Sequence, residues 1–183
     1  MSPRIASLPL IERECWRELE VAARDRDHGF RRMGLATVDG NAADLRTVLL
    51  REVQAEQRRL LFFTDARSPK VTQLRAHPAA TLMVWCDRLG WQLRLRVLLE
   101  VETSGLAVSS RWARLKLTPA ARDYLSPLPP GAPLDPVRPE RASRSQFAVV
   151  SAQVQSIDWL ELHADGHRRA LFDASGQGQW LTP

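Results

Sequence analysis

Two consecutive segments, RRMGLATVDG at residues 31–40 and DLRTVLLREV at residues 44–53, decide the predicted fold. Both are rich in apolar and β-branched residues, which favour extended structure. The first segment ends in Asp39-Gly40, a dipeptide typical of a tight hairpin turn. The sequence therefore predicts two antiparallel strands joined at that turn.

The remaining chain predicts further strands with short helices inserted between them. Strand patterns lie at RRLLFFTD, AATLMVWC and WQLRLRVLLEVE (residues 58–65, 79–86 and 91–102), and later at QFAVVSAQVQ, SIDWLELH, HRRALFD and QWLTP (residues 146–155, 156–163, 167–173 and 179–183). Helical spacing lies at residues 8–27, 68–77, 107–117 and 120–125, and a second hairpin turn at Asp165-Gly166. So many strand-length runs disfavour a helical bundle and favour a small antiparallel barrel.

The predicted architecture is mainly β with inserted helices (α+β), in one domain over residues 1–183. It has an N-terminal helix within residues 1–28 and a proline-rich loop over residues 126–139. Neither G-x-G-x-x-G nor G-x-x-x-x-G-K-[ST] occurs, so neither a Rossmann nor a P-loop domain is predicted.

The composition is that of an ordinary globular protein: 183 residues, of which 44% are hydrophobic and 26% charged. Cys15 and Cys86 form no C-x-x-C motif or metal-ligand spacing, which predicts reduced thiols, a cytoplasmic location and no metal site. No signal-peptide core and no membrane-length apolar run occur, so no membrane contact is predicted. The net charge of +5 suits nucleic acid or a phosphorylated small ligand.

The stretch FFTDARSPK, residues 62–70, ends a predicted strand and begins a predicted helix. Free backbone N–H groups and the positive end of the helix dipole lie at such a junction. Thr64 and Ser68 supply hydroxyls there, and Arg67 and Lys70 supply positive charge. This set suits a phosphate group, while the alternative is a capped turn with solvated cations.

Two predicted strands carry polar side chains in a regular pattern. Arg46 and Arg51 lie on opposite faces of residues 44–53. Gln92, Arg94 and Arg96 share one face of residues 91–102, and an amide there could bond the edge of a heterocycle. The alternative for both strands is a solvent-facing side of an antiparallel sheet.

Near the C-terminus, His167 and Arg169 alternate onto one strand face, with Trp159 upstream. No further His or Cys is spaced to complete a metal shell. Asp and Glu are scattered at positions typical of a surface, so no carboxylate pair for acid–base chemistry is predicted. The tryptophans favour core positions, although any one could stack on an aromatic ligand.

In their order along the chain, these segments resemble the pyridoxamine 5′-phosphate oxidase-like, FMN-binding split-barrel superfamily. RTVLLR (46–51) is similar to the family's Arg-x-Val-Leu-Leu-Lys/Arg segment, and LFFTDARSPK (61–70) to its segment containing Thr, Ser and Lys. WQLRLRV (91–97) and LELHADGHRRALF (160–172) resemble later strands of the family. The resemblance implies a six-stranded antiparallel split β-barrel and a homodimer with FMN at the subunit interface.

The resemblance also implies roles for individual residues. Cofactor binding falls to Arg46, Thr47, Val48, Leu49, Phe63, Thr64, Arg67, Ser68, Lys70, Gln92, Trp159 and Arg169, with Arg67, Ser68 and Lys70 on the FMN phosphate. Substrate binding falls to Arg51, Arg111, Arg114 and His167. No residue is predicted to be a dedicated catalytic acid or base.

The chain departs from the family's pattern where a Gln-Ser pair is missing and the proline-rich loop stands instead. The resemblance therefore implies an FMN-dependent oxidoreductase acting on a small molecule, and not specifically a vitamin B6 oxidase. Two alternatives are a non-catalytic flavin carrier or sensor and a nucleic-acid-binding β-barrel. Few aromatics alternate with the basic strand positions, so nucleic acid is not the predicted partner.

Overall fold

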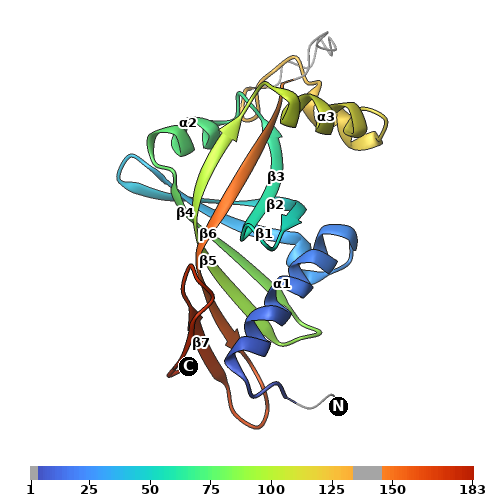
Figure 1. Cartoon of the computed structure of the whole chain (residues 1–183). Helices are drawn as coiled ribbons and strands as arrows, with labels where there is room; N and C mark the ends of the chain where they lie inside the picture. The colour runs from blue at the N-terminus through green and yellow to red at the C-terminus, as the bar shows by residue number, and fades with distance from the viewer. Residues whose placement is uncertain (1–3, 134–145) are drawn as a thin grey trace.

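A computed structural model describes residues 4–133 and 146–183 of the chain. Its eight strands form one antiparallel sheet in the order β3-β2-β1-β4-β5-β6-β7-β8, and β3 also pairs with β6. The strands are β1 (Arg32–Asp39), β2 (Ala42–Gln54), β3 (Arg59–Asp65), β4 (Ala79–Cys86), β5 (Trp91–Glu102), β6 (Phe147–Glu161), β7 (Arg168–Phe172) and β8 (Gly178–Leu181). The β3–β6 pairing closes a ring of six strands, which confirms the predicted six-stranded antiparallel split barrel (Figure 1).

Within the described residues, three α-helices and two 3₁₀ turns surround this barrel. They are α1 (Leu8–Arg24), η1 (Gly29–Arg31), α2 (Pro69–Ala76), α3 (Leu106–Leu115) and η2 (Pro119–Tyr124). Figure 1 shows α1 lying along the end of the molecule near both termini, while α2 and α3 lie at the opposite end. The α1 residues Ile11, Cys15 and Leu19 have no exposed surface, because the helix packs its apolar face on the barrel core.

The strands form where apolar and polar residues alternate along the sequence. In β5, Leu93, Leu95 and Val97 are buried, while Arg94 and Arg96 are exposed, as period-two alternation predicts. The β1–β2 hairpin turns at Gly40, whose φ of 59° lies in the left-handed region that glycine adopts at low cost. Both features confirm the strand pattern expected from the sequence.

Three differences from the predicted elements exceed a shift of one or two residues at an end. The N-terminal helix ends at Arg24, because the Asp25 side chain accepts a hydrogen bond from the Asp27 N–H in a turn that competes with the helix. The predicted helix at residues 120–125 is the 3₁₀ turn η2. The two strands predicted between residues 146 and 163 are one continuous strand, β6, with an irregularity in its pairing to β5 between Arg96 and Val97.

Residues 126–133, where the predicted proline-rich loop begins, contain no helix or strand. Its predicted continuation over residues 134–139 lies outside the described residues. Cys15 and Cys86 are free and buried thiols. Within the described ranges, no helix combines the length and apolar character that crossing a membrane requires.

Candidate functional site

The junction between β3 and α2 forms the first part of the candidate site. Ser68 is the N-cap residue of α2 and Pro69 follows it, but the Ser68 side chain caps no backbone N–H. Its Oγ instead accepts a hydrogen bond of 2.6 Å from Lys70 Nζ, which also donates to Thr64 Oγ1 at 3.2 Å. The polar side chains of this turn therefore point toward one another and do not serve as helix caps.

Arg46 on β2 joins this group through an interlocked set of polar side chains. Its guanidinium donates to the buried Thr37 hydroxyl, to Gln73 Oε1 at 2.8 Å and to the carboxylate of Asp44. Gln73 Nε2 in turn donates to Asp44 Oδ2 at 2.9 Å, so β1, β2 and α2 are tied together at this point. We call Arg46, Thr64, Ser68 and Lys70 the cationic cradle.

Thr37 and Gln73 were not predicted from the sequence. Gln73 lies three residues after Lys70, a spacing that places both on one side of α2 and could have indicated its role. Thr37 carries no comparable signal, because only the β1–β2 pairing brings it near Arg46.

The cradle carries more positive charge than the surrounding carboxylates neutralise. Burial, together with the nearby Arg46 charge, lowers the pKa of Lys70 below its ordinary value. Among the described residues Lys70 is in no ion pair, because the adjacent Asp65 carboxylate pairs with Arg67. Two cations and two hydroxyls at the N-terminus of a helix form a donor set that suits a phosphate monoester.

Arg67 is directed away from the cradle. Its guanidinium bonds both oxygens of Asp65, at 3.0 and 2.7 Å, and also donates to the backbone carbonyls of Ser126, Pro127 and Leu128. Arg67 therefore fastens the start of the proline-rich loop to the end of β3. The structure does not bring it together with Ser68 and Lys70, as the predicted phosphate role requires.

An exposed face of the sheet lies beside the cradle. Thr47 and Leu49 point outward from β2, whereas Val48 points into the barrel. Four large apolar side chains on this face are unusually exposed: Leu45 (71%), Met83 (41%), Val38 (40%) and Leu49 (39%). Gln92 and Arg169 share a cross-strand row on β5 and β7, with Leu160 of β6 between them.

A cavity of about 430 Å³ opens at one end of this face. Its lining includes Leu49 and Arg51 of β2, and the Arg51 guanidinium also lies 5.8 Å from the ring centre of Phe63. Arg26, Arg31 and Arg32 line the same cavity, together with residues of α3, the turn after it and η2. The sequence reasoning missed these three arginines, although they cluster within seven residues.

Trp159 and Arg169 have other partners. Trp159 has no exposed surface, and its ring contacts the rings of Trp91 and Trp180 in the core. Arg169 pairs with Asp158 at 2.8 Å. Trp159 therefore packs β6 against β5 and β8, and Arg169 joins β7 to β6.

The remaining predicted substrate residues are spread apart. Arg111 and Arg114 both face Glu52, at 2.7 and 3.8 Å. His167 lies in the exposed turn before β7, where its Nδ1 accepts from the His163 N–H. Of the predicted substrate residues, only Arg51 lines the cavity beside the sheet face.

The expectation that carboxylates lie on the surface is wrong for three residues. Glu18, Asp65 and Glu161 are 3, 4 and 6% exposed, and each is held by basic side chains. Glu18 accepts from His28 Nε2 at 2.8 Å and from Arg88 at 2.7 Å. Its place on the apolar face of α1, between Cys15 and Ala22, was the signal of burial.

Comparison with known proteins identifies the family. A family model described as pyridoxamine 5′-phosphate oxidase, FMN-binding domain, matches residues 13–102. A pyridoxine/pyridoxamine 5′-phosphate oxidase of Caulobacter vibrioides is 33% identical over 182 residues, which cover 90% of this chain and 79% of that protein. The chain belongs to the pyridoxamine 5′-phosphate oxidase family.

Solved structures agree with this family's fold. A pyridoxamine 5′-phosphate oxidase-related, FMN-binding protein of Nostoc punctiforme superimposes with a TM-score of 0.75 at 24% identity, over 93% of this chain and 96% of that one. PhzG from Burkholderia lata, solved with tetrahydrophenazine-1-carboxylic acid, gives a TM-score of 0.76 at 15% identity, over 100% and 99% of the two chains. At sequence identities of 24% and 15%, these two similarities establish a shared fold and no more.

Proposed function

We propose that this protein is an FMN-dependent oxidoreductase acting on a small molecule, and that the cationic cradle holds the FMN phosphate. The observation that carries the proposal is Lys70, a half-buried cation beside Arg46 with no carboxylate of its own. Charge-assisted hydrogen bonds from these two residues and from the Thr64 and Ser68 hydroxyls match the acceptors of a phosphate monoester. The family's FMN-binding domain supports the choice of ligand.

The flavin ring would lie along the segments that lead away from the cradle. The outward side chains of Thr47 and Leu49, and the backbone around Val48 and Phe63, offer an apolar wall with backbone polar groups. Bound FMN supplies hydride transfer and electron storage that no amino-acid side chain can supply. The chain's own residues orient that group and exclude water, and we assign none of them as a catalytic acid or base.

We further propose that a second copy of the chain covers the exposed sheet face and completes the site. Soluble monomers rarely leave several large apolar side chains exposed on one flat face. Leu45, Met83, Val38 and Leu49 form such a face here. Gln92 and Arg169 lie across the same sheet, where a second copy could bring them against the FMN bound by the first.

Flavin content tests the proposed function directly. The purified protein is expected to be yellow or to become yellow with added FMN, with flavin absorbance bands, and mass spectrometry of the released molecule should give FMN. A protein that stays colourless and shows no thermal shift with FMN contradicts the proposal. Reduction of bound FMN by amine or alcohol substrates, followed by absorbance, tests the oxidoreductase part.

The dimer is tested by charge insertion at the centre of the face. Leu45→Glu is expected to convert a dimer into a monomer in light-scattering measurements, because the partner would have to bury the carboxylate. Leu106→Glu is the matched control, since Leu106 is 83% exposed but lies on α3. Dimers of unchanged stability in Leu45→Glu would place the interface elsewhere.

A further inference from the structure

The carboxylate of Asp44 lies beside a cradle that is otherwise built of cations and hydroxyls. It accepts hydrogen bonds from the Arg46 guanidinium and from Gln73 Nε2, the second at 2.9 Å. These bonds lower the pKa of Asp44, with the Gln73 bond as the larger cause, so the side chain carries its negative charge at neutral pH. A negative charge at this place repels an incoming anion.

The Arg46 guanidinium is already bound to acceptors of the protein itself. Nη1 donates to the Leu35 carbonyl at 3.3 Å and to the Thr37 hydroxyl. Nη2 donates to Gln73 Oε1 at 2.8 Å and to the Asp44 carboxylate. A guanidinium has five N–H groups and makes four hydrogen bonds here, so bidentate binding of a phosphate requires one of the acceptors to leave.

Asp44 is the acceptor that can leave most easily. The Leu35 carbonyl belongs to the backbone of β1, and Thr37 and Gln73 are buried, at 3 and 7% exposed. The Asp44 side chain, in contrast, is 43% exposed. It lies on the β1–β2 hairpin, which projects from the barrel beside α2 (Figure 1), so a change of rotamer moves its carboxylate into water.

We propose that Asp44 is an internal competitor, which occupies Arg46 until the phosphate group of the ligand displaces it. The exchange replaces one anionic oxygen with another on Nη2, while Thr37 and Gln73 keep the guanidinium in place. Asp44 thereby sets how tightly the cradle holds a phosphate. The identity of the ligand as FMN rests on the proposed function, whereas the competition concerns any phosphate group.

Removing the charge of Asp44 but not its acceptor oxygen tests the competition. Asp44→Asn retains an Oδ1 that accepts from Arg46 and Gln73. The matched control is Asp39→Asn, which removes the same charge from an exposed position of the same hairpin. Fluorescence titration measures the affinity of each variant for FMN and for riboflavin, which lacks the phosphate.

Asp44→Asn is expected to bind FMN about three- to tenfold more tightly than the wild type, because the phosphate no longer has to displace a carboxylate. Riboflavin affinity should stay unchanged, as should FMN affinity in Asp39→Asn. In an Arg46→Gln background the gain should fall below about twofold, since no guanidinium is left for Asp44 to occupy. Unchanged or weaker FMN binding in Asp44→Asn, or an equal gain for Asp39→Asn or for riboflavin, overturns the proposal.

The outcome is separable from that of the proposed function. FMN that binds equally to the wild type and to Asp44→Asn contradicts the competition and leaves the FMN proposal standing. If the wild type takes up no FMN, calorimetry with inorganic phosphate at constant ionic strength replaces the flavin titration. Tighter phosphate binding in Asp44→Asn than in the wild type and in Asp39→Asn then supports the competition alone, and equal or undetectable binding contradicts it.

Discussion

Two groups of basic residues in this molecule are held in different ways. Where β6 and β7 meet, Glu161 pairs with Arg4 and Arg168 at 2.5 and 2.9 Å, and Asp158 pairs with Arg94 and Arg169. By contrast, Lys70 is held by the Ser68 and Thr64 hydroxyls, Arg31 by backbone carbonyls of α1 and Arg51 by the Phe63 ring, and none of these three cations has an ion-pair partner among the described residues. The contrast teaches that arginine content alone does not locate a ligand: a cation whose charge a buried carboxylate already neutralises gains less from an anionic ligand than a cation without such a partner.

The largest expected effect is on the paired end. Glu161→Gln leaves Arg4 and Arg168 without their shared carboxylate, so we expect a loss of about 2–4 kcal/mol in the free energy of unfolding. FMN affinity should change little. Urea denaturation measures the stability, and the control is Glu56→Gln, at an exposed position that has no ion pair within the described residues. A stable Glu161→Gln protein would show that this end is not held by its charges.

Loss of Lys70 from the cationic cradle should have the reverse pattern: FMN affinity should fall, while the stability of the FMN-free protein should not. Lys70→Met is expected to weaken FMN binding by about 1.5–3 kcal/mol, the worth of a charge-assisted hydrogen bond. The FMN-free protein should be at least as stable as the wild type, because burial and Arg46 disfavour the charge of Lys70.

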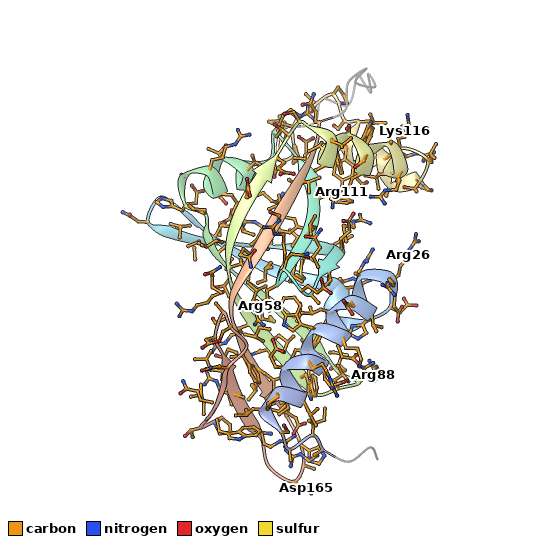
Figure 2. The ribbon with its side chains drawn as sticks, viewed as in Figure 1. Arg26, Arg58, Arg88, Arg111, Lys116 and Asp165 are labelled. Carbon is orange, nitrogen blue, oxygen red and sulfur yellow. The ribbon has the colours of Figure 1, made fainter. Side chains whose placement is uncertain are left out.

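Fluorescence titration with FMN and thermal unfolding measure these two quantities. Lys116→Met removes the chain's other lysine, which is exposed after α3, and serves as the control (Figure 2). Unchanged FMN affinity in Lys70→Met would contradict the proposal that the cradle binds the FMN phosphate.

Arg67 allows a paired and an unpaired cation to be compared within one turn. It lies three residues from Lys70 but forms an ion pair with Asp65. Arg67→Gln should lower the free energy of unfolding by about 1–3 kcal/mol, because the buried Asp65 loses its partner. It should change FMN affinity less than threefold, a smaller change than that expected for Lys70→Met. A larger loss of FMN binding in Arg67→Gln would restore its sequence-predicted role on the phosphate.

The barrel could be predicted from the sequence because its strands alternate so regularly. In β5 each outward arginine lies between two buried apolar residues, and Asp39-Gly40 sets the first hairpin. The prediction failed in β6, where Gln155 and Ser156 interrupt the apolar pattern and look like a turn. The structure keeps one strand there and absorbs the interruption in an irregular pairing with β5.

The candidate site could be predicted only where its parts are close in sequence. Thr64, Ser68 and Lys70 lie on one turn, so their grouping was visible. Which partner a charge takes depends on the fold: Arg67 is captured by Asp65 and by carbonyls about 60 residues away. The cavity beside the sheet face was missed because one of its walls comes from the end of α3 and from η2, far along the chain from Arg26 to Arg51.

The smallest expected effects are on the pH dependence of stability. The effect of Glu161 falls below pH 4.5, and the effect of Lys70 falls in the range below pH 10.5. At Glu161 burial would raise the carboxyl pKa, but the bonds from Arg168 and Arg4 outweigh burial and lower it below 4.5. Its stabilisation is thus complete above pH 4.5 and is lost as the pH falls through the folded-state pKa. As the pH is lowered from about 7 to about 3, the unfolding temperature should therefore fall more steeply for the wild type than for Glu161→Gln.

At Lys70 the lowered pKa means that the unfolded chain binds the proton more tightly. The stability of the FMN-free wild type should therefore rise, relative to Lys70→Met, as the pH increases from the folded-state pKa toward the ordinary value of 10.5. Bound phosphate should remove this rise, because its negative charge favours the protonated lysine. The same scans, run with and without saturating FMN, check both statements, and a rise that persists with FMN bound would show that the phosphate does not reach Lys70.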